Sequence, residues 1–218
     1  MCYAANMRSY GHYCAVAKGL DVVGDRWTLL IVRELLLQGG CRYTDLQHGL
    51  PGIATNLLSE RLKELEENGL IRREAAPPPI ATTLYDLTDA GRELEPVLRA
   101  LGRFGARFMP APTGDEAFRS HWLAFPVSEF LRDGEPEVPP AVIEVRTGEQ
   151  PAIIEVGGGE IGTRLGSVPS PDLVLEGDPP AILGFLSGML KLSEARKLGL
   201  RTKGSTTVLR RLRYQVPT

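Results

Sequence analysis

Residues 54–68 separate polar side chains from leucines when they are drawn as a helix. Leu58, Leu62 and Leu65 follow the four-then-three spacing of a buried helix face. The opposite side begins with short polar groups, which can reach base edges in the major groove of DNA without holding the helix away. The pattern therefore predicts a helix that reads nucleic acid. The predicted contact residues on this helix are Thr55, Asn56, Ser59, Glu60, Arg61 and Lys63.

Within this set, Asn56 suits an adenine contact, whereas Arg61 and Lys63 suit guanine or phosphate. The alternative is the solvated face of an ordinary helix, or a surface for another protein. Glu60 and Glu64 favour that alternative, because carboxylates repel phosphate. Most of the glutamates of this helix lie toward its C-terminal end, away from the predicted groove.

The segments 69–74 and 82–87 resemble strands and flank three consecutive prolines at 77–79. Proline cannot donate to a strand ladder, so these prolines predict the loop of a hairpin. Polar side chains at the base of a hairpin can contact phosphate, which positions a protein on DNA. The predicted DNA contacts outside the reading helix are Arg72, Arg73, Thr82 and Thr83 on the hairpin and Thr44 in the short helix before it.

The elements that must position these side chains follow from periodicity and turn residues. Helices are expected at 27–37 and 43–49, before a turn at 50–52. The reading helix, the hairpin and a last helix from Thr88 to about Met109 follow. Helix, turn, helix and hairpin in this order form the winged helix-turn-helix plan.

Composition sets the broad class. The chain has 218 residues, of which 43% are hydrophobic and 24% charged, which indicates neither disorder nor a membrane protein. The longest apolar stretch, 20–37, is interrupted by charged residues, and no secretory signal opens the chain. Three cysteines without metal-ligand spacing favour a reducing, cytoplasmic location. Because the net charge is −2, DNA binding must depend on locally placed cations.

The pattern changes after the proline-rich segment 110–114, which predicts a linker between a domain at 1–109 and another at 115–218. The second half is expected to be a small α+β domain with a mostly antiparallel sheet packed on helices, and the whole chain is classed as α+β. The predicted strands are 142–145, 152–156, 161–165, 172–176 and a short edge at 200–203. The predicted helical segments are 113–132, which Pro126 must break or kink, 178–188, 193–198 and 205–213.

Residues 14–105 closely resemble the HxlR-type winged-helix regulators. The resemblance implies a homodimer joined through terminal helices, with two reading helices about one DNA turn apart on a pseudopalindromic duplex. One departure is Ala15, where the family often has proline. The matching motifs are LDVVGDRWTLLIVREL at 20–35, RYTDL at 42–46, LPGIATNLLSERLKEL at 50–65, YDLT at 85–88 and GREL at 91–94.

The same resemblance draws attention to Cys14, because several family members sense oxidants or electrophiles through the matching cysteine. Such a thiol needs a lowered pKa, which a helix start beside a cation can provide. The flanking residues are apolar, and Lys18 is the nearest cation. The alternative is a packing thiol near the dimer interface.

The second half resembles the sterol-carrier-protein-like fold, on residues 171–178, 182–188 and 204. That resemblance implies an apolar cavity for a lipidic or otherwise apolar small-molecule effector. The alternative is that the same aromatic residues form an ordinary core. The predicted wall residues are Trp122, Phe125, Phe130, Phe185, Leu186, Met189 and Leu190.

No catalytic set, metal site or cofactor motif is predicted. His12, His48 and His121 have neither a paired nucleophile nor metal-ligand spacing. The glycine-rich segment 157–162 lacks the lysine of a phosphate loop and is interpreted as a turn. The sequence thus favours a ligand-responsive DNA-binding repressor rather than an enzyme. The alternatives are a thiol switch with a passive second domain and a lipid-binding or scaffold protein that does not bind DNA.

Overall fold

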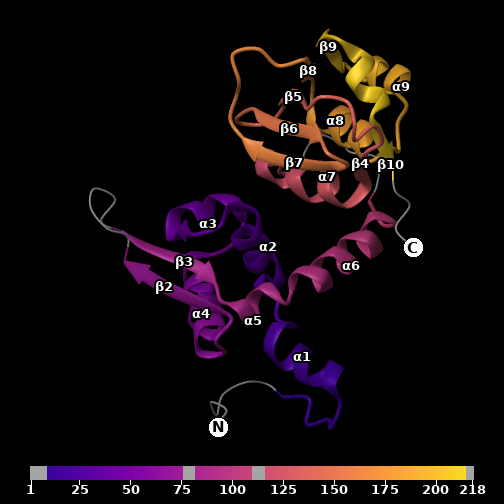
Figure 1. Ribbon diagram of the computed structural model, residues 1–218. Helices are drawn as coiled ribbons and strands as arrows, with labels where there is room; N and C mark the ends of the chain where they lie inside the picture. The colour runs from indigo at the N-terminus through magenta and orange to yellow at the C-terminus, as the bar shows by residue number, and fades with distance from the viewer. Residues whose placement is uncertain (1–8, 76–81, 110–115, 215–218) are drawn as a thin grey trace. The chain divides into compact units, whose positions relative to one another are not determined.

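The computed structural model describes residues 9–75, 82–109 and 116–214, and the chain divides into two compact units, Met1–Gly102 and Arg103–Thr218 (Figure 1). The predicted linker at 110–114 and the predicted hairpin loop at 77–79 lie outside the described residues, so the proposed domain limits stay predictions. Mixed helix and strand content confirms the α+β class. Among the described residues, no helix has the length and apolar run that a membrane crossing needs.

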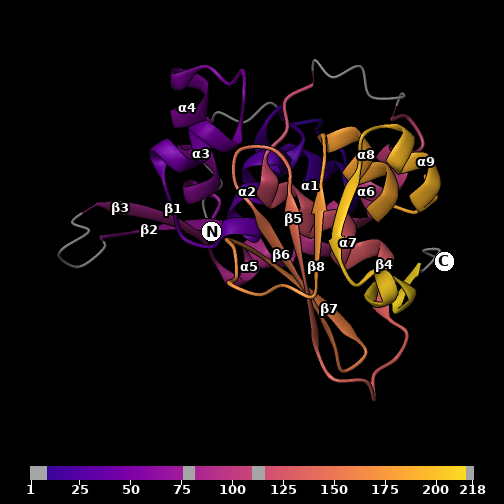
Figure 2. The ribbon, with the colours of Figure 1, turned by 90° about the horizontal axis from the view of Figure 1, so that it is seen from above.

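The first unit contains a helix-rich body and a hairpin that extends away from it in both views (Figure 2). Its short sheet has the strand order β1-β3-β2, all antiparallel, with Ile71 opposite Leu87. The elements are α1 (Ala15–Val23), α2 (Thr28–Gln38), β1 (Cys41–Arg42), α3 (Tyr43–Gly49), α4 (Thr55–Glu67), β2 (Ile71–Ala75), β3 (Thr83–Leu87), α5 (Asp89–Arg92) and α6 (Glu95–Ala106), the last of which crosses into the second unit.

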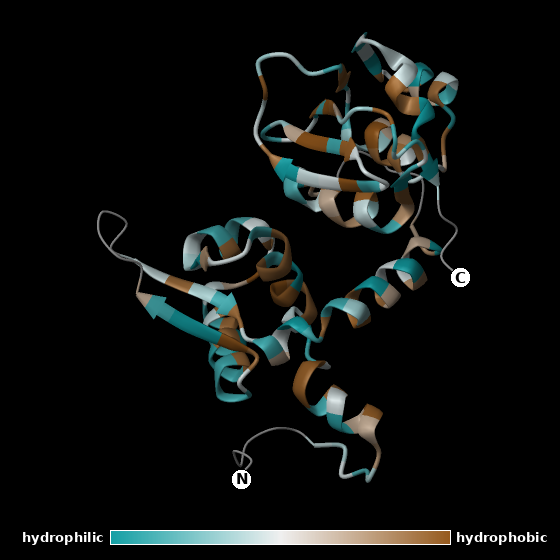
Figure 3. Ribbon diagram, viewed as in Figure 1, coloured by the Kyte–Doolittle hydropathy of each residue, from teal (hydrophilic) through white to brown (hydrophobic). Residues whose placement is uncertain are grey.

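The helix α2 is the centre of the first unit. Ile31, Val32 and Leu35 on α2 have no exposed surface, and Figure 3 colours much of this helix as hydrophobic. A charged residue, Glu34, is equally buried and accepts hydrogen bonds from Arg33 and Gln38. Burial of a carboxylate is tolerated because these donors replace water.

The single helix predicted from Thr88 to about Met109 is wrong, because the structure has two helices there, α5 and α6. Thr88 caps the start of α5 as predicted, accepting a hydrogen bond from the Gly91 amide at 3.1 Å. A turn at 93–94 then separates α5 from α6. Pro96 explains the break, because proline inside a helix removes a hydrogen bond and clashes with the preceding turn, whereas it is accepted in a first turn.

The second unit is a five-stranded sheet packed on helices. The strand order is β7-β6-β5-β8-β9, and every pairing is antiparallel except that of β5 with β8. The elements are a 3₁₀ turn at Ser120–Leu123, α7 (Ala124–Phe130), β4 (Leu131–Asp133), β5 (Ala141–Arg146), β6 (Ala152–Gly157), β7 (Glu160–Leu165), β8 (Leu173–Glu176), α8 (Pro179–Leu186), α9 (Leu192–Lys197), β9 (Arg201–Gly204), a 3₁₀ turn at Thr206–Arg210 and β10 (Leu212–Tyr214).

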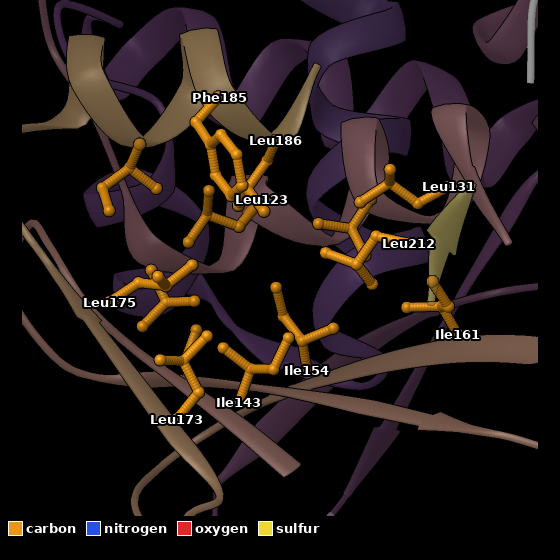
Figure 4. Packing of buried hydrophobic residues seen from close by; sticks show 14 of the residues in the cluster. Leu123, Leu131, Ile143, Ile154, Ile161, Leu173, Leu175, Phe185, Leu186 and Leu212 are labelled. Atoms are coloured by element: carbon orange, nitrogen blue, oxygen red, sulfur yellow. The ribbon is translucent and has the colours of Figure 1, made fainter. Parts of the chain in front are cut away.

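The core of this unit lies between one sheet face and the helices. Figure 4 shows Ile143, Ile154 and Leu173 of the sheet pointing toward Phe185 and Leu186 of α8. Alternation along each strand produces this face, because successive side chains point to opposite sides of a sheet. The mostly antiparallel sheet packed on helices agrees with the sequence-based expectation.

Two helical predictions in the second unit are wrong. The described part of the segment 113–132 forms a 3₁₀ turn, α7 and the start of β4, and the closing segment 205–213 forms a 3₁₀ turn followed by β10. The strand β10 pairs antiparallel with β4, which sequence analysis did not predict. Pairing between segments about 80 residues apart overrides the local helical spacing.

A buried ion pair connects Asp133 on β4 with Arg211, the residue just before β10. The guanidinium of Arg211 donates two hydrogen bonds to the carboxylate of Asp133, at 3.1 and 2.8 Å, and a third to the Pro139 carbonyl at 2.6 Å. The side chain of Asp133 has no exposed surface, and that of Arg211 is 5% exposed. Hydrogen bonds from Arg211, the largest influence, lower the pKa of Asp133 to about 2. The pair is therefore charged throughout the neutral range.

Candidate nucleic-acid interface

The start of α4 presents the polar surface that the sequence predicts. Leu58, Leu62 and Leu65 face the core, each at most 2% exposed. Backbone carbonyls that the last turn of α4 would leave unused accept hydrogen bonds from the amides of Gly69 and Leu70, and Gly69 has a φ of 70°, which is accessible to glycine. The outward-facing side chains, all exposed, are Thr55, Asn56, Ser59, Glu60 and Lys63.

The helix α3 fixes where α4 begins. The hydroxyl of Tyr43 donates to the Thr55 carbonyl at 2.8 Å, and the Gln47 amide donates to the Thr55 hydroxyl at 3.1 Å. Thr44, another predicted contact, is exposed at the start of α3. Sequence analysis missed Tyr43 and Gln47 as positioning residues. Their spacing of four residues, one turn of the predicted helix, was the available signal.

Arg61 differs from the other predicted contacts because carboxylates already hold it. Its guanidinium lies 2.6 Å from Asp25, which precedes α2, and also pairs with Glu60 and Glu64 on α4. The side chain is only 12% exposed, and its buried Nε has no hydrogen-bond partner among the described residues. Burial is the main cause that raises the pKa of Glu64. Arg61 therefore anchors α4 to the loop before α2, and its contact with DNA stays a prediction.

The hairpin arginines are also paired with carboxylates, but they remain near the surface. Arg72 lies 2.6 Å from Glu74 and 3.1 Å from Asp86, while Arg73 lies 2.9 Å from Glu66 on α4. Their side chains are 49% and 54% exposed. Exposed pairs of this kind are weak, about 0–1 kcal/mol, so phosphate can compete for both arginines. Of the two threonines predicted beside them, Thr83 is exposed and Thr82 half-buried.

Two helices of this region leave apolar side chains without cover. On α6, Val97, Leu101 and Phe104 are 47%, 47% and 56% exposed. Their spacing places them on one stripe, which Phe108 extends beyond the end of the helix. On α1, Val16 and Leu20, one helical turn apart, are 71% and 46% exposed. Apolar stripes of this kind mark surfaces that bind another protein.

The two described cysteines have opposite environments. Cys14 is exposed at the start of α1, where the Ala17 amide, the largest cause, and the Val16 amide lower the pKa of its thiol. Cys41 is buried, and burial is the main cause that raises its pKa to about 12. The cation nearest in sequence to Cys14, Lys18, is paired with Asp21 at 3.3 Å. Of the two, only Cys14 has the exposure and pKa direction of a reactive thiol.

The structure separates the predicted wall residues of the second unit into three groups. Phe185 and Leu186 belong to the packed core, 7% and 0% exposed, whereas Met189 is 61% exposed. The remaining residues, all half-buried, are Trp122, Phe125, Phe130 and Leu190. An apolar cavity bounded by these seven residues stays a prediction.

Comparison with known proteins supports the reading of the first unit. The model of the HxlR-like helix-turn-helix family matches residues 22–113. An uncharacterised HTH-type transcriptional regulator from Synechocystis is 36% identical over 99 residues, which cover 45% of this chain and 73% of the relative. The uncharacterised HTH-type transcriptional regulator YvaP from Bacillus subtilis is 36% identical over 92 residues, 42% of this chain and 84% of the relative.

Among solved structures, the reduced form of the transcriptional regulator YodB from B. subtilis is similar, with 28% identity, a TM-score of 0.40, and coverage of 46% of this chain and 99% of that one. The family model matches the part of the chain that contains α2, α3, α4 and the hairpin. The chain therefore belongs to the HxlR-like helix-turn-helix family of transcriptional regulators.

Proposed function

We propose that the chain is a dimeric, DNA-binding transcription regulator that inserts the start of α4 into the major groove. The observation that carries this proposal is the exposed polar start of α4 above three buried leucines. Asn56 and Lys63 are exposed and have the chemistry to contact bases or phosphate. Arg72 and Arg73 supply the phosphate contacts that hold the helix in register.

The dimer in this proposal is formed by a second copy of the chain. The exposed stripes on α1 and α6 support it, because a single chain leaves them in water. A symmetric pair would present two copies of α4, and half-sites for such dimers lie about 34–36 Å apart. The operator is therefore expected to be pseudopalindromic.

Selection of duplexes from a random pool by the purified full-length protein tests the proposal. The enriched sequences should contain two inverted half-sites about one helical turn apart. Asn56→Ala should reduce affinity for the selected duplex at least tenfold, while Asn68→Ala, at the other end of α4, serves as the matched control. A failure to enrich any sequence, or equal losses in both variants, would contradict the proposal.

The finer proposal is a repressor whose second unit binds an apolar small-molecule effector. The half-buried aromatic residues Trp122, Phe125 and Phe130 support it as candidate wall residues. Control of DNA binding requires that the effector bind the DNA-competent and DNA-free states with different affinities. Titration with fatty acids of increasing length should change affinity for the selected duplex. If no apolar compound binds or alters DNA affinity, the effector part is rejected and the DNA-binding part stands.

A thiol switch is the second candidate, favoured by the exposure and lowered pKa of Cys14. Oxidation by diamide should then reduce affinity for the selected duplex in the parent protein but not in Cys14→Ser. Cys41→Ser is the matched control, because burial holds the Cys41 thiol protonated. Retention of the full oxidant response in Cys14→Ser would reject this candidate.

A further inference from the structure

The charges of the second unit are separated along the chain. Residues 116–195 contain thirteen acidic side chains and five lysines and arginines, whereas residues 196–213 contain seven lysines and arginines and no acidic side chain. The net charge of −2 for the whole chain therefore conceals a strongly basic segment. Figures 1 and 2 both show this segment, at the yellow end of the chain, along one side of the second unit.

One cation of this segment is used inside the fold, and the others lie on the surface. Arg211 is buried against Asp133, as described above, and the other six cationic side chains are exposed. Arg201 and Lys203 are two residues apart on the edge strand β9, so they point to the same side of that strand. We call the six exposed residues the basic edge, which consists of Arg196, Lys197, Arg201, Lys203, Arg210 and Arg213.

The basic edge has no carboxylate partners of its own. Among the described residues, none of its six side chains forms an ion pair. Other exposed arginines of the second unit are paired, as Arg146 is with Glu144 and Arg164 is with Glu155. Unpaired charges of one sign repel one another, and a polyanion bound at the basic edge would relieve that repulsion.

Carboxylates that adjoin the basic edge do not neutralise it. Glu194 and Asp172 each accept a hydrogen bond from a backbone amide, both at 2.7 Å. Glu176 lies opposite Arg201 in the register of β8 and β9, yet the two side chains form no ion pair. The guanidinium and ammonium groups of the basic edge therefore remain available to a partner.

Duplex DNA fits this surface better than a membrane does. A protein surface that lies on a membrane usually needs an amphipathic helix with a long apolar face. The helix that contributes to the basic edge, α9, has only six residues. Exposed hydroxyl side chains follow β9 at Ser205, Thr206 and Thr207. Lysine, arginine, serine and threonine are side chains that contact DNA phosphates.

We propose that the basic edge binds the phosphate backbone of duplex DNA without reading its sequence. This inference rests on the proposed DNA binding by α4, because both units belong to one chain and binding by one raises the effective concentration of DNA for the other. The acidic remainder of the second unit repels DNA, so the unit approaches with its basic edge first. The second unit then adds affinity, while the first unit supplies sequence specificity.

The salt dependence of DNA affinity tests the proposal, because its slope counts the phosphates that a protein neutralises. The full-length protein is titrated with the selected duplex, extended on both sides by random sequence. Arg201→Gln/Lys203→Gln should reduce the slope of log affinity against log salt by about 1–2 and weaken binding at least tenfold in about 0.15 M salt. Arg201→Lys keeps the charge and should keep the slope.

Arg164→Gln is the matched control, because Arg164 is an exposed arginine on β7, the opposite edge strand of the same sheet, and is paired with Glu155. Its slope should equal that of the parent protein. An unchanged slope in Arg201→Gln/Lys203→Gln, or an equal change in Arg164→Gln, would overturn the proposal.

Two other roles of the basic edge predict different results. Charged side chains on an edge strand can prevent aggregation, so aggregation of Arg201→Gln/Lys203→Gln with an unchanged slope would assign that role and overturn the proposal. Binding to phosphatidylserine vesicles that this variant loses, again with an unchanged slope, would assign the surface to membranes and overturn it too. Asn56→Ala should lose affinity for the selected duplex in every case, so a failure of the α4 proposal is recognised separately.

Discussion

The two units use their charged residues in opposite ways. In the first unit, the ion pairs of Lys63 on α4 and of Arg72 and Arg73 on the hairpin are open to water, and Arg61 is the exception on α4 because its side chain is only 12% exposed. In the second unit, Asp133 and Arg211 are almost completely buried and bonded to each other. Surface pairs can exchange partners at little cost, whereas a buried pair cannot lose one member without leaving an uncompensated charge. The contrast indicates pairs that can open to bind other molecules in the first unit and a rigid closure inside the second.

The apolar residues show the same division. The second unit collects its large aliphatic side chains into one continuous core. The first unit keeps a small core around α2 but leaves the stripes of α1 and α6 exposed. A domain that leaves apolar stripes in water is incomplete alone, so part of its stability depends on a partner.

The largest expected effect is the loss of the buried pair. Arg211→Met leaves the Asp133 carboxylate without its main partner, and unfolding of the second unit in urea should become easier by about 3–5 kcal/mol. The double variant Asp133→Leu/Arg211→Met should recover part of this loss, because no charge is then left unpaired. If Arg211→Met lowers the free energy of unfolding by less than about 1 kcal/mol, the contrast between the buried pair of the second unit and the exposed pairs of the first is contradicted.

The same pair predicts how the second unit responds to acid. The folded-state pKa of Asp133 is about 2, below its ordinary value of 3.8. A lowered folded pKa contributes stability above the unfolded value, and that stability is lost as the pH falls through the folded value. The Asp133 contribution should therefore be complete above about pH 4 and disappear between pH 4 and 2. Asp133→Asn should flatten this part of a pH titration of stability.

Substitutions at two nearby positions of α4, Leu58 and Asn56, should differ in their effect on the stability of the first unit. Leu58→Ala removes a fully buried side chain and should reduce the stability of the first unit by about 2–5 kcal/mol. Asn56→Ala, two residues earlier on the exposed side, should change stability by less than about 0.5 kcal/mol but reduce DNA affinity. Chemical denaturation and DNA titration of the same samples measure both. Similar stability losses would contradict the outward orientation of Asn56.

The exposed stripe of α6 should control assembly more than folding. Leu101→Arg places a charge in the stripe and should convert dimer to monomer in light scattering, with a thermal unfolding temperature lowered by no more than a few degrees. Gly102→Arg introduces the same charge at the adjacent exposed position, off the stripe, and is the control. An unchanged dimer in Leu101→Arg, or dissociation in both variants, would contradict the proposed interface.

The smallest effect concerns the weak pairs of the hairpin. Glu66→Gln releases Arg73 from its carboxylate partner, 2.9 Å away, and should increase DNA affinity by up to about fivefold, the range expected for an exposed pair. Stability should be nearly unchanged. Lys63→Ala should act in the opposite direction and reduce the slope of affinity against salt. A weaker complex in Glu66→Gln would indicate that Glu66 positions Arg73 rather than competes for it.

Local patterns were sufficient for the elements that carry the candidate interface. The helix α3 has the predicted limits, and α4 differs by one residue at each end, because the turn at 50–52 and Gly69 provide clear boundaries. The inward leucines of α4 also follow directly from spacing. These features depend on neighbours within about four residues, which sequence periodicity records.

Long-range partners were not predictable in the same way. Asp25 lies 36 residues from Arg61, and nothing in the spacing of α4 indicates that they meet. The strand β10 follows a stretch with helical spacing, yet its pairing with β4 determines its conformation. Helical spacing therefore predicted which side of α4 is buried, but it did not predict that Arg61 forms an ion pair with Asp25.

The pairing of β4 with β10 also has a consequence for synthesis. A ribosome releases the chain from its N-terminus, so the first unit can fold while the second is still being made. The ribosome makes β4 about 80 residues before the strand that pairs with it. Asp133 therefore has no Arg211 to pair with until that later part of the chain is made. Until then the nascent second unit has an open edge and an uncompensated acidic side chain. Ribosome stalling between these two strands should therefore yield a chain with a folded first unit and a protease-sensitive remainder.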